Sequence, residues 1–179
     1  MKADDIWKIS TGKGVIVAVI DSGVDRIPEL EGQVLPGKDF ATSGYSGDER
    51  TDYDKHGTTM AAVIAGSGKH PSGDGSFGLA PGAKILPIRV PHEGGRGTSW
   101  TEAIRYAADS DARVINISMG SSTEDPARRE AVEYALSKGK LIFCCRRKLW
   151  EFDPSGQLSR CDAWRGGCWS RKCRRRRDR

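Results

Sequence analysis

The residues best suited to chemistry in this sequence are an aspartate and a histidine, each at the edge of a predicted secondary-structure element. Asp21 directly follows the apolar run Val15–Ile20, and His56 stands within D-K-H-G-T, where a helical pattern begins. An aspartate that holds an imidazole in one tautomer and a histidine that takes up a proton are two members of a nucleophilic catalytic triad. An aspartate after a strand is also a common turn residue, and a single histidine often has a structural role. These two residues by themselves leave both interpretations open.

Positioning these two side chains requires a sheet of parallel strands. Apolar runs without alternation predict strands that are covered on both faces, at 15–20, 84–90, 113–118 and 140–143. Helical patterns alternate with them, at 56–66, 99–109 and 125–139. Ser99 and Glu102 form a capping-box pattern, and Asp125 and Pro126 mark another helix start. The alternation predicts a doubly wound α/β fold, in which functional residues follow the carboxyl ends of the strands, as Asp21 does.

A more specific signal comes from four segments, VIVAVIDSGVDRIPEL, DKHGTTMAAVIAG, GLAPGAKILPIRV and RVINISMG. In this order they resemble the subtilisin-like serine peptidases, or subtilases, over roughly residues 5–143. Ile6-Trp7, the LPIRV strand and AIRYAADSDARVINIS resemble the actinobacterial mycosin-type branch, which is associated with type VII secretion.

The resemblance implies a fold and a set of site residues. The fold would be an incomplete doubly wound parallel sheet of the subtilisin type, with residues 1–143 as the N-terminal part of the catalytic domain. Asp21 would be the catalytic aspartate and His56 the general base. Ser118, Met119 and Gly120 would line the substrate-binding cleft, and the substrate would be a peptide or a protein.

The sequence departs from the family pattern in small and large ways. Lys55 stands where the family usually has Gly before the histidine, and Ile27 where His often precedes the proline; neither change removes a chemical group. The large departure is that no A-A-G-N segment with an oxyanion-binding Asn and no G-T-S-M-A segment with a nucleophilic Ser is present. The one G-T-S, Gly97–Ser99, continues as Trp-Thr-Glu and is interpreted as a helix cap. We therefore expect a serine-type endopeptidase family member that has no nucleophile and is inactive as written.

Residues 144–179 differ in character from the preceding part of the chain. They hold all five cysteines, ten Arg, two Lys and four acids, a net charge of +8 in a chain whose total is +5. Codons for Arg, Cys, Trp and Gly share G at the second base, so reading them one base later gives Ala, Gly, Val, Asp or Glu. From Cys145 onward the shifted frame permits AAGNSG, the missing oxyanion segment. We expect a frameshift near 143–145 and an out-of-frame, disordered tail at 144–179.

Other interpretations of the charged and cysteine-rich segments stay open. The alternative function is a noncatalytic binding module, in which a degenerate protease domain carries a basic tail. The tail would bind nucleic acid through charge alone, and no specific nucleic acid is expected as a partner. A zinc site is disfavoured, because the tail has no His and its cysteines lack the paired C-x2–4-C spacing. The acidic loop contains Asp48, Glu49, Asp52 and Asp54. Calcium binding by this loop stays open, but we expect a solvated loop and no cofactor.

The first residues, MKADDIWKIST, are polar and charged. We expect no signal peptide in this stretch and no membrane-spanning run in the sequence. The resemblance implies a full-length protein that is secreted or lies in the cell envelope. The chain as written is expected to stay in the cytoplasm.

Overall fold

The computed structural model describes residues 3–41, 48–91, 99–118 and 125–144. These residues form a five-stranded sheet of order β2-β3-β1-β4-β5, in which all neighbouring strands are parallel. The strands are β1 (Ile16–Asp21), β2 (Lys38–Asp39), β3 (Lys84–Arg89), β4 (Val114–Ile117) and β5 (Leu141–Cys144). β1 is therefore the central strand.

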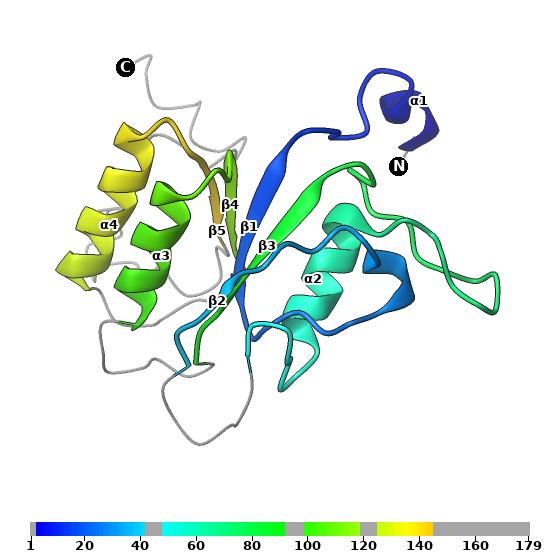
Figure 1. Cartoon of the computed structure of the whole chain (residues 1–179). Coiled ribbons are helices and arrows are strands. Elements are labelled where there is room, and N and C mark those ends of the chain that lie inside the picture. The colour runs from blue at the N-terminus through cyan, green and yellow to red at the C-terminus, as the bar shows by residue number, and fades with distance from the viewer. Residues whose placement is uncertain (1–2, 42–47, 92–98, 119–124, 145–179) are drawn as a thin grey trace, which may run out of the picture.

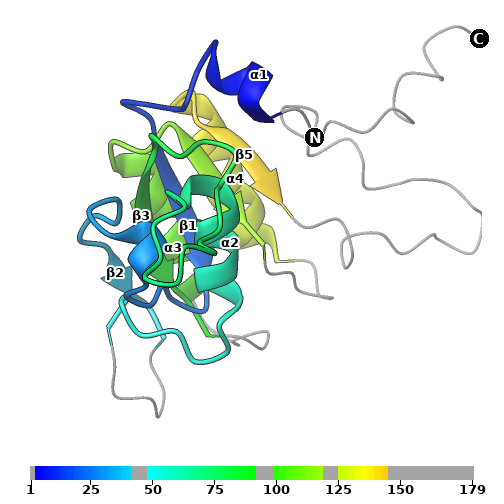
Figure 2. The same cartoon turned by 90° about the vertical axis from the view of Figure 1, so that its right-hand side faces the viewer.

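Helices cover both faces of the sheet (Figures 1 and 2). α2 (His56–Ala65) lies on one face, together with the 3-10 turn η1 (Pro28–Leu30). α3 (Ser99–Asp109) and α4 (Pro126–Ser137) pack against each other on the opposite face, and α1 (Ala3–Trp7) precedes the sheet. This arrangement confirms the doubly wound α/β fold predicted from the sequence.

The central strand contributes to two cores. Ala18 and Ile20 are fully buried in the cluster under α3 and α4. Val17 and Val19 are buried in the cluster on the α2 side. Because successive side chains of a strand point to opposite faces, a strand covered on both sides needs apolar residues throughout. The continuous apolar run before Asp21 is therefore required by its central position.

The predicted elements are present, with ends shifted by one or two residues. α4 begins as predicted, since the Asp125 carboxylate accepts the Ala127 N–H at 3.0 Å and Pro126 occupies the first turn. α3 begins at Ser99 itself, and the residues before it, 92–98, lie outside the described residues. β2 was not predicted, because a strand of only two polar residues leaves no apolar run.

β5 is the last described element and pairs with β4. Its side chains Leu141 and Phe143 remain 46% and 45% exposed. Cys144 ends the strand, and the remainder of the predicted tail, from Cys145 onward, lies outside the described residues. None of the helices within the described ranges is long and apolar enough to cross a membrane.

Candidate active site

Asp21 ends the central strand and its side chain is fully buried. Its Oδ1 and Oδ2 lie 2.8 and 3.0 Å from Nδ1 of His56. Oδ1 also accepts hydrogen bonds from the backbone N–H of Ser22, at 2.7 Å, and from the Ser22 hydroxyl, at 3.1 Å. These donors fix the carboxylate in one orientation, facing the imidazole.

His56 is the first residue of α2, and its side chain is 47% exposed. Because Nδ1 donates to Asp21, Nε2 is the nitrogen left to accept a proton. The hydrogen bond to Asp21 raises the pKa of His56 above its ordinary value, burial opposes this, and the charges of Asp21, Asp54 and Asp52 add to the rise. The arrangement is that of a general base whose protonated form is stabilised by a buried carboxylate.

Two glycines allow α2 to start this close to the end of β1. A Cβ at Gly57 would collide with the carbonyl oxygen of Gly23 and approach the side chain of Asp21 within 3.0 Å. Gly23 itself has φ 121°, and a Cβ there would collide with the carbonyl oxygen of Thr51. The D-S-G and H-G-T patterns therefore have a steric basis as well as a chemical one.

A second acid, Asp52, connects the loop before α2 to the first turn of that helix. Asp52 is buried, with only 5% of its surface exposed. Oδ1 accepts the hydroxyl of Ser22 at 2.7 Å and the backbone N–H groups of Asp54 and Lys55 at 3.2 and 2.9 Å. Oδ2 accepts the backbone N–H and the hydroxyl of Thr58 at 2.8 and 2.5 Å. Asp52 therefore satisfies amides at the start of α2 that have no partner within the helix.

Ser22 links Asp52 to the Asp21–His56 pair. Its hydroxyl oxygen lies between the carboxylates of Asp21 and Asp52, and accepts the backbone N–H of Gly57 at 2.9 Å. Burial by itself would raise the pKa of Asp52, but the hydrogen bonds from Thr58, Ser22 and the Asp54 amide outweigh it, and the pKa is lowered. The network holds the carboxylate of Asp21 and the start of α2 in one rigid unit.

The interpretation of the acidic loop as solvated is wrong for Asp52, which is buried and hydrogen-bonded. The sequence did contain a signal, because an acid shortly before a helical pattern is a typical N-terminal partner for free amides. Elsewhere in the loop, the Asp48 carboxylate accepts the Arg50 amide at 2.8 Å, as in a turn. Among the residues described, no group of three or more His, Cys, Asp or Glu side chains is arranged to hold a metal ion.

The geometry agrees with comparisons to known proteins. The model of the Subtilase family matches residues 12–146, most of the chain. The chain belongs to the subtilase family.

Individual subtilases show how far the similarity extends. A thermophilic serine proteinase of Bacillus sp. (strain AK1) is 38% identical over 143 residues, which cover 78% of this chain and 34% of that protein. Mycosin-3 of Mycobacterium tuberculosis is 38% identical over 146 residues, covering 73% of this chain and 30% of that protein. A crystal structure of MycP1 without its N-terminal propeptide superposes with a TM-score of 0.67 at 31% identity, covering 93% of this chain and 55% of that one.

The similarity to the mycosins expected from the sequence is thus confirmed. The chain spans from about a fifth to a half of the length of the curated relatives it matches.

The structure gives a reason for the glycine that other subtilases place before the histidine. Lys55 has φ 67° and ψ 1°, and it is the only non-glycine residue with positive φ among those described. Glycine adopts this conformation without the steric penalty of a Cβ. The Lys55 amide donates to Asp52 and its ammonium group pairs with Asp25, which holds the residue in place. This departure changes the backbone strain of the site and leaves its chemical groups intact.

The remaining predicted site residues follow β4. The register pairs Ile117 with Ile20, so Ser118 leaves the sheet beside the end of β1. Its hydroxyl oxygen accepts the side-chain N–H of Asn116 at 2.5 Å. Met119 and Gly120 lie outside the described residues. The role of Ser118, Met119 and Gly120 in substrate binding stays a prediction.

Proposed function

We propose that the protein is a serine-type endopeptidase of the subtilisin family, in which Asp21 and His56 are two members of the catalytic triad. The buried contact between the Asp21 carboxylate and Nδ1 of His56, at 2.8 and 3.0 Å, carries the proposal. A serine hydroxyl at Nε2 would give its proton to His56 and attack a peptide carbonyl. Asp21 would then stabilise the imidazolium, which agrees with the raised pKa of His56. The similarity to MycP3 and MycP1, which come from type VII secretion systems, supports a protein substrate and a place among the proteases of such a system.

We further propose that the 179-residue chain by itself does not hydrolyse peptides. The family's nucleophile and oxyanion segments have no counterpart in its sequence, and Ser99 begins a helix. In subtilisin, loss of the nucleophile lowers turnover by roughly 10⁶. Loss of the oxyanion-binding side chain costs roughly 10²–10³. The two losses do not add, because without the serine no acyl-enzyme forms.

A frameshift near 143–145 is our explanation for the missing segments. The composition of 144–179 supports it, and so does the match to the family model, which stops at residue 146. The nucleotide sequence around codons 142–146 tests it directly. An open frame one base away that encodes A-A-G-N and, further on, G-T-S-M-A is the expected finding. Without such a frame the explanation fails.

Activity is tested in two preparations. The purified 179-residue chain should not react with a serine-directed fluorophosphonate probe, and labelling that disappears on Ser99→Ala would contradict the proposal. A protein translated in the corrected frame should hydrolyse a peptide and lose roughly 10⁶ in turnover on His56→Ala. The basic tail leaves the binding-module function as the second candidate, and salt-sensitive RNA binding by the folded 179-residue chain would favour it.

A further inference from the structure

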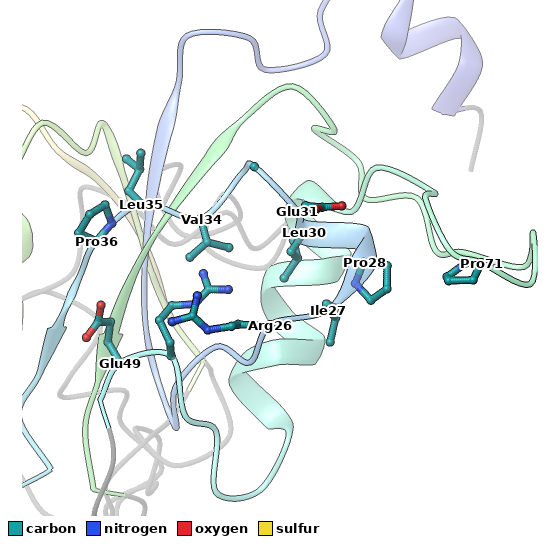
Figure 3. A pocket seen from close by; sticks show the side chains of 12 residues that line it. Arg26, Ile27, Pro28, Leu30, Glu31, Val34, Leu35, Pro36, Glu49 and Pro71 are labelled. Atoms are coloured by element: carbon teal, nitrogen blue, oxygen red, sulfur yellow. The ribbon is translucent and has the colours of Figure 1, made fainter.

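A cleft of about 760 Å³ lies at the β2 side of the sheet, beside η1 (Figure 3). Its walls come from η1, from the segment that leads to β2 and from Arg50 in the loop before α2. Pro28, Leu35 and Pro36 give it apolar surface, and Arg26 projects into it (Figure 3). A cleft of this size suits a short peptide segment better than a single small ion.

Two guanidinium groups line this cleft without a carboxylate partner. Among the described residues, neither Arg26 nor Arg50 is in an ion pair. Arg50 is half-buried, and its Nε is shielded from solvent with no hydrogen-bond partner. Its one described side-chain hydrogen bond, from Nη2 to the carbonyl oxygen of Asp25, is long at 3.5 Å.

Two acids, Glu31 and Glu49, also line the cleft. The Glu49 carboxylate accepts the backbone N–H of Gly37 at 3.2 Å. Asp25 accepts the Asp52 amide and pairs with Lys55. Glu31 lies at the other end of the cleft from Glu49 (Figure 3). Among the residues described, none of these carboxylates is in an ion pair with Arg26 or Arg50.

The electrostatics agree with this geometry. Burial and the positive charge of Arg26 lower the pKa of Arg50, and the charges of Glu49, Asp48 and Asp25, which raise it, are weaker. A negative charge between Arg26 and Arg50 would relieve this repulsion. Guanidinium groups bind carboxylates through paired N–H donors, which makes them suited to an acidic side chain.

We propose that this cleft binds an acidic peptide segment, with a Glu or Asp carboxylate held between Arg26 and Arg50 and the neighbouring apolar side chains against Pro28, Leu35 and Pro36. The segment would belong to a protein partner. The proposal does not depend on peptidase activity, because it concerns binding at a cleft that contains neither Asp21 nor His56.

The test measures binding to the ¹⁵N-labelled 179-residue chain by NMR. The probe is acetyl-Leu-Glu-Leu-amide and the matched control is acetyl-Leu-Gln-Leu-amide. Both are titrated at about 0.15 M salt, where distant surface charges are largely screened. The Glu peptide should shift the backbone signals of Ile27, Leu30, Gly32 and Leu35, and should bind about tenfold or more tightly than the Gln peptide. Inorganic phosphate should bind more weakly than the Glu peptide, because it cannot use the apolar wall.

Variants separate the cleft from general positive charge. Arg50→Gln and Arg26→Gln should each remove the preference for the Glu peptide, whereas Arg113→Gln, at an exposed arginine before β4, should leave it unchanged. Arg26 is exposed, so its variant decides the matter if Arg50→Gln fails to fold. Equal binding of the two peptides, equal binding of phosphate, shifts confined to other residues, or an equal loss with Arg113→Gln would each overturn the proposal.

Discussion

Asp52 should be a major determinant of the stability of the site, although it takes no part in the proposed proton transfer. The substitution Asp52→Ala removes an acceptor for five hydrogen bonds, donated by Ser22, the Asp54 and Lys55 amides, and Thr58 twice. Asp52→Asn is the finer change, since it keeps one carbonyl oxygen and turns an NH₂ group towards donors on the other side. The residue is 5% exposed, so water cannot readily replace the lost acceptor.

The size of the effect follows from this network. A hydrogen bond to a charged group contributes about 1.5–3 kcal/mol, and contributions within one network do not add. We therefore expect Asp52→Ala to lower the free energy of unfolding by about 3–5 kcal/mol, and Asp52→Asn by about 2–3 kcal/mol. Domains of this kind have total stabilities of about 5–15 kcal/mol, so the alanine variant should be close to unfolding. Asp74→Asn, at an exposed loop position, should stay within about 0.5 kcal/mol of the unsubstituted chain.

Urea denaturation followed by circular dichroism measures these differences, and its pH dependence adds a second criterion. The pKa of Asp52 is lowered in the folded state, so its contribution is present above its unfolded pKa and is lost as pH falls through the lower folded value. The window therefore lies below about pH 4. Asp52→Asn should lack this acid-dependent component. If its urea midpoint and acid limb match those of the unsubstituted chain, the buried network is not the stabilising unit described here.

Three further changes probe the same site. Asp21→Asn should lower the pKa of His56 measured by NMR. It should also remove a stabilisation of the folded state that is present below about pH 6.5 and is lost as pH rises through the raised folded pKa of His56. An unchanged titration of His56 would show that Asp21 does not hold the imidazole. Gly57→Ala should destabilise the fold by about 1–3 kcal/mol in urea, because its Cβ would collide with Gly23 and crowd Asp21; an unchanged urea midpoint would show that this close approach is not required. Lys55→Gly should stabilise by about 0.5–1 kcal/mol through relief of left-handed backbone strain, and a lower urea midpoint would mean that the Lys55–Asp25 pair outweighs that strain.

The parts of the fold that the sequence predicts are those with a strong local cause. The apolar run before Asp21 predicts a strand because a central strand must be covered on both faces, and β1 is central. Asp125 and Pro126 predict the start of α4 because a cap requires specific residues at specific places. β2 has no such local cause, since its two residues, Lys38 and Asp39, are held by pairing with Ile88 and Arg89, about 50 positions away. Sheet order likewise depends on pairings that no local pattern contains.

The same distinction applies within the site. The contact between Asp21 and His56 could be expected because the residue types, their places at element ends and the surrounding motifs all agree. Asp52 was grouped with the surface acids of its loop because its burial depends on Ser22, 30 residues earlier, and on the way α2 folds back onto β1. The sequence showed only that Lys55 removes no chemical group from the site. Its effect comes from its positive φ, which the type of side chain does not reveal. In both cases the backbone at the start of α2 is what brings His56 to Asp21. Substitutions there should therefore change the alignment of the pair even when neither Asp21 nor His56 is altered.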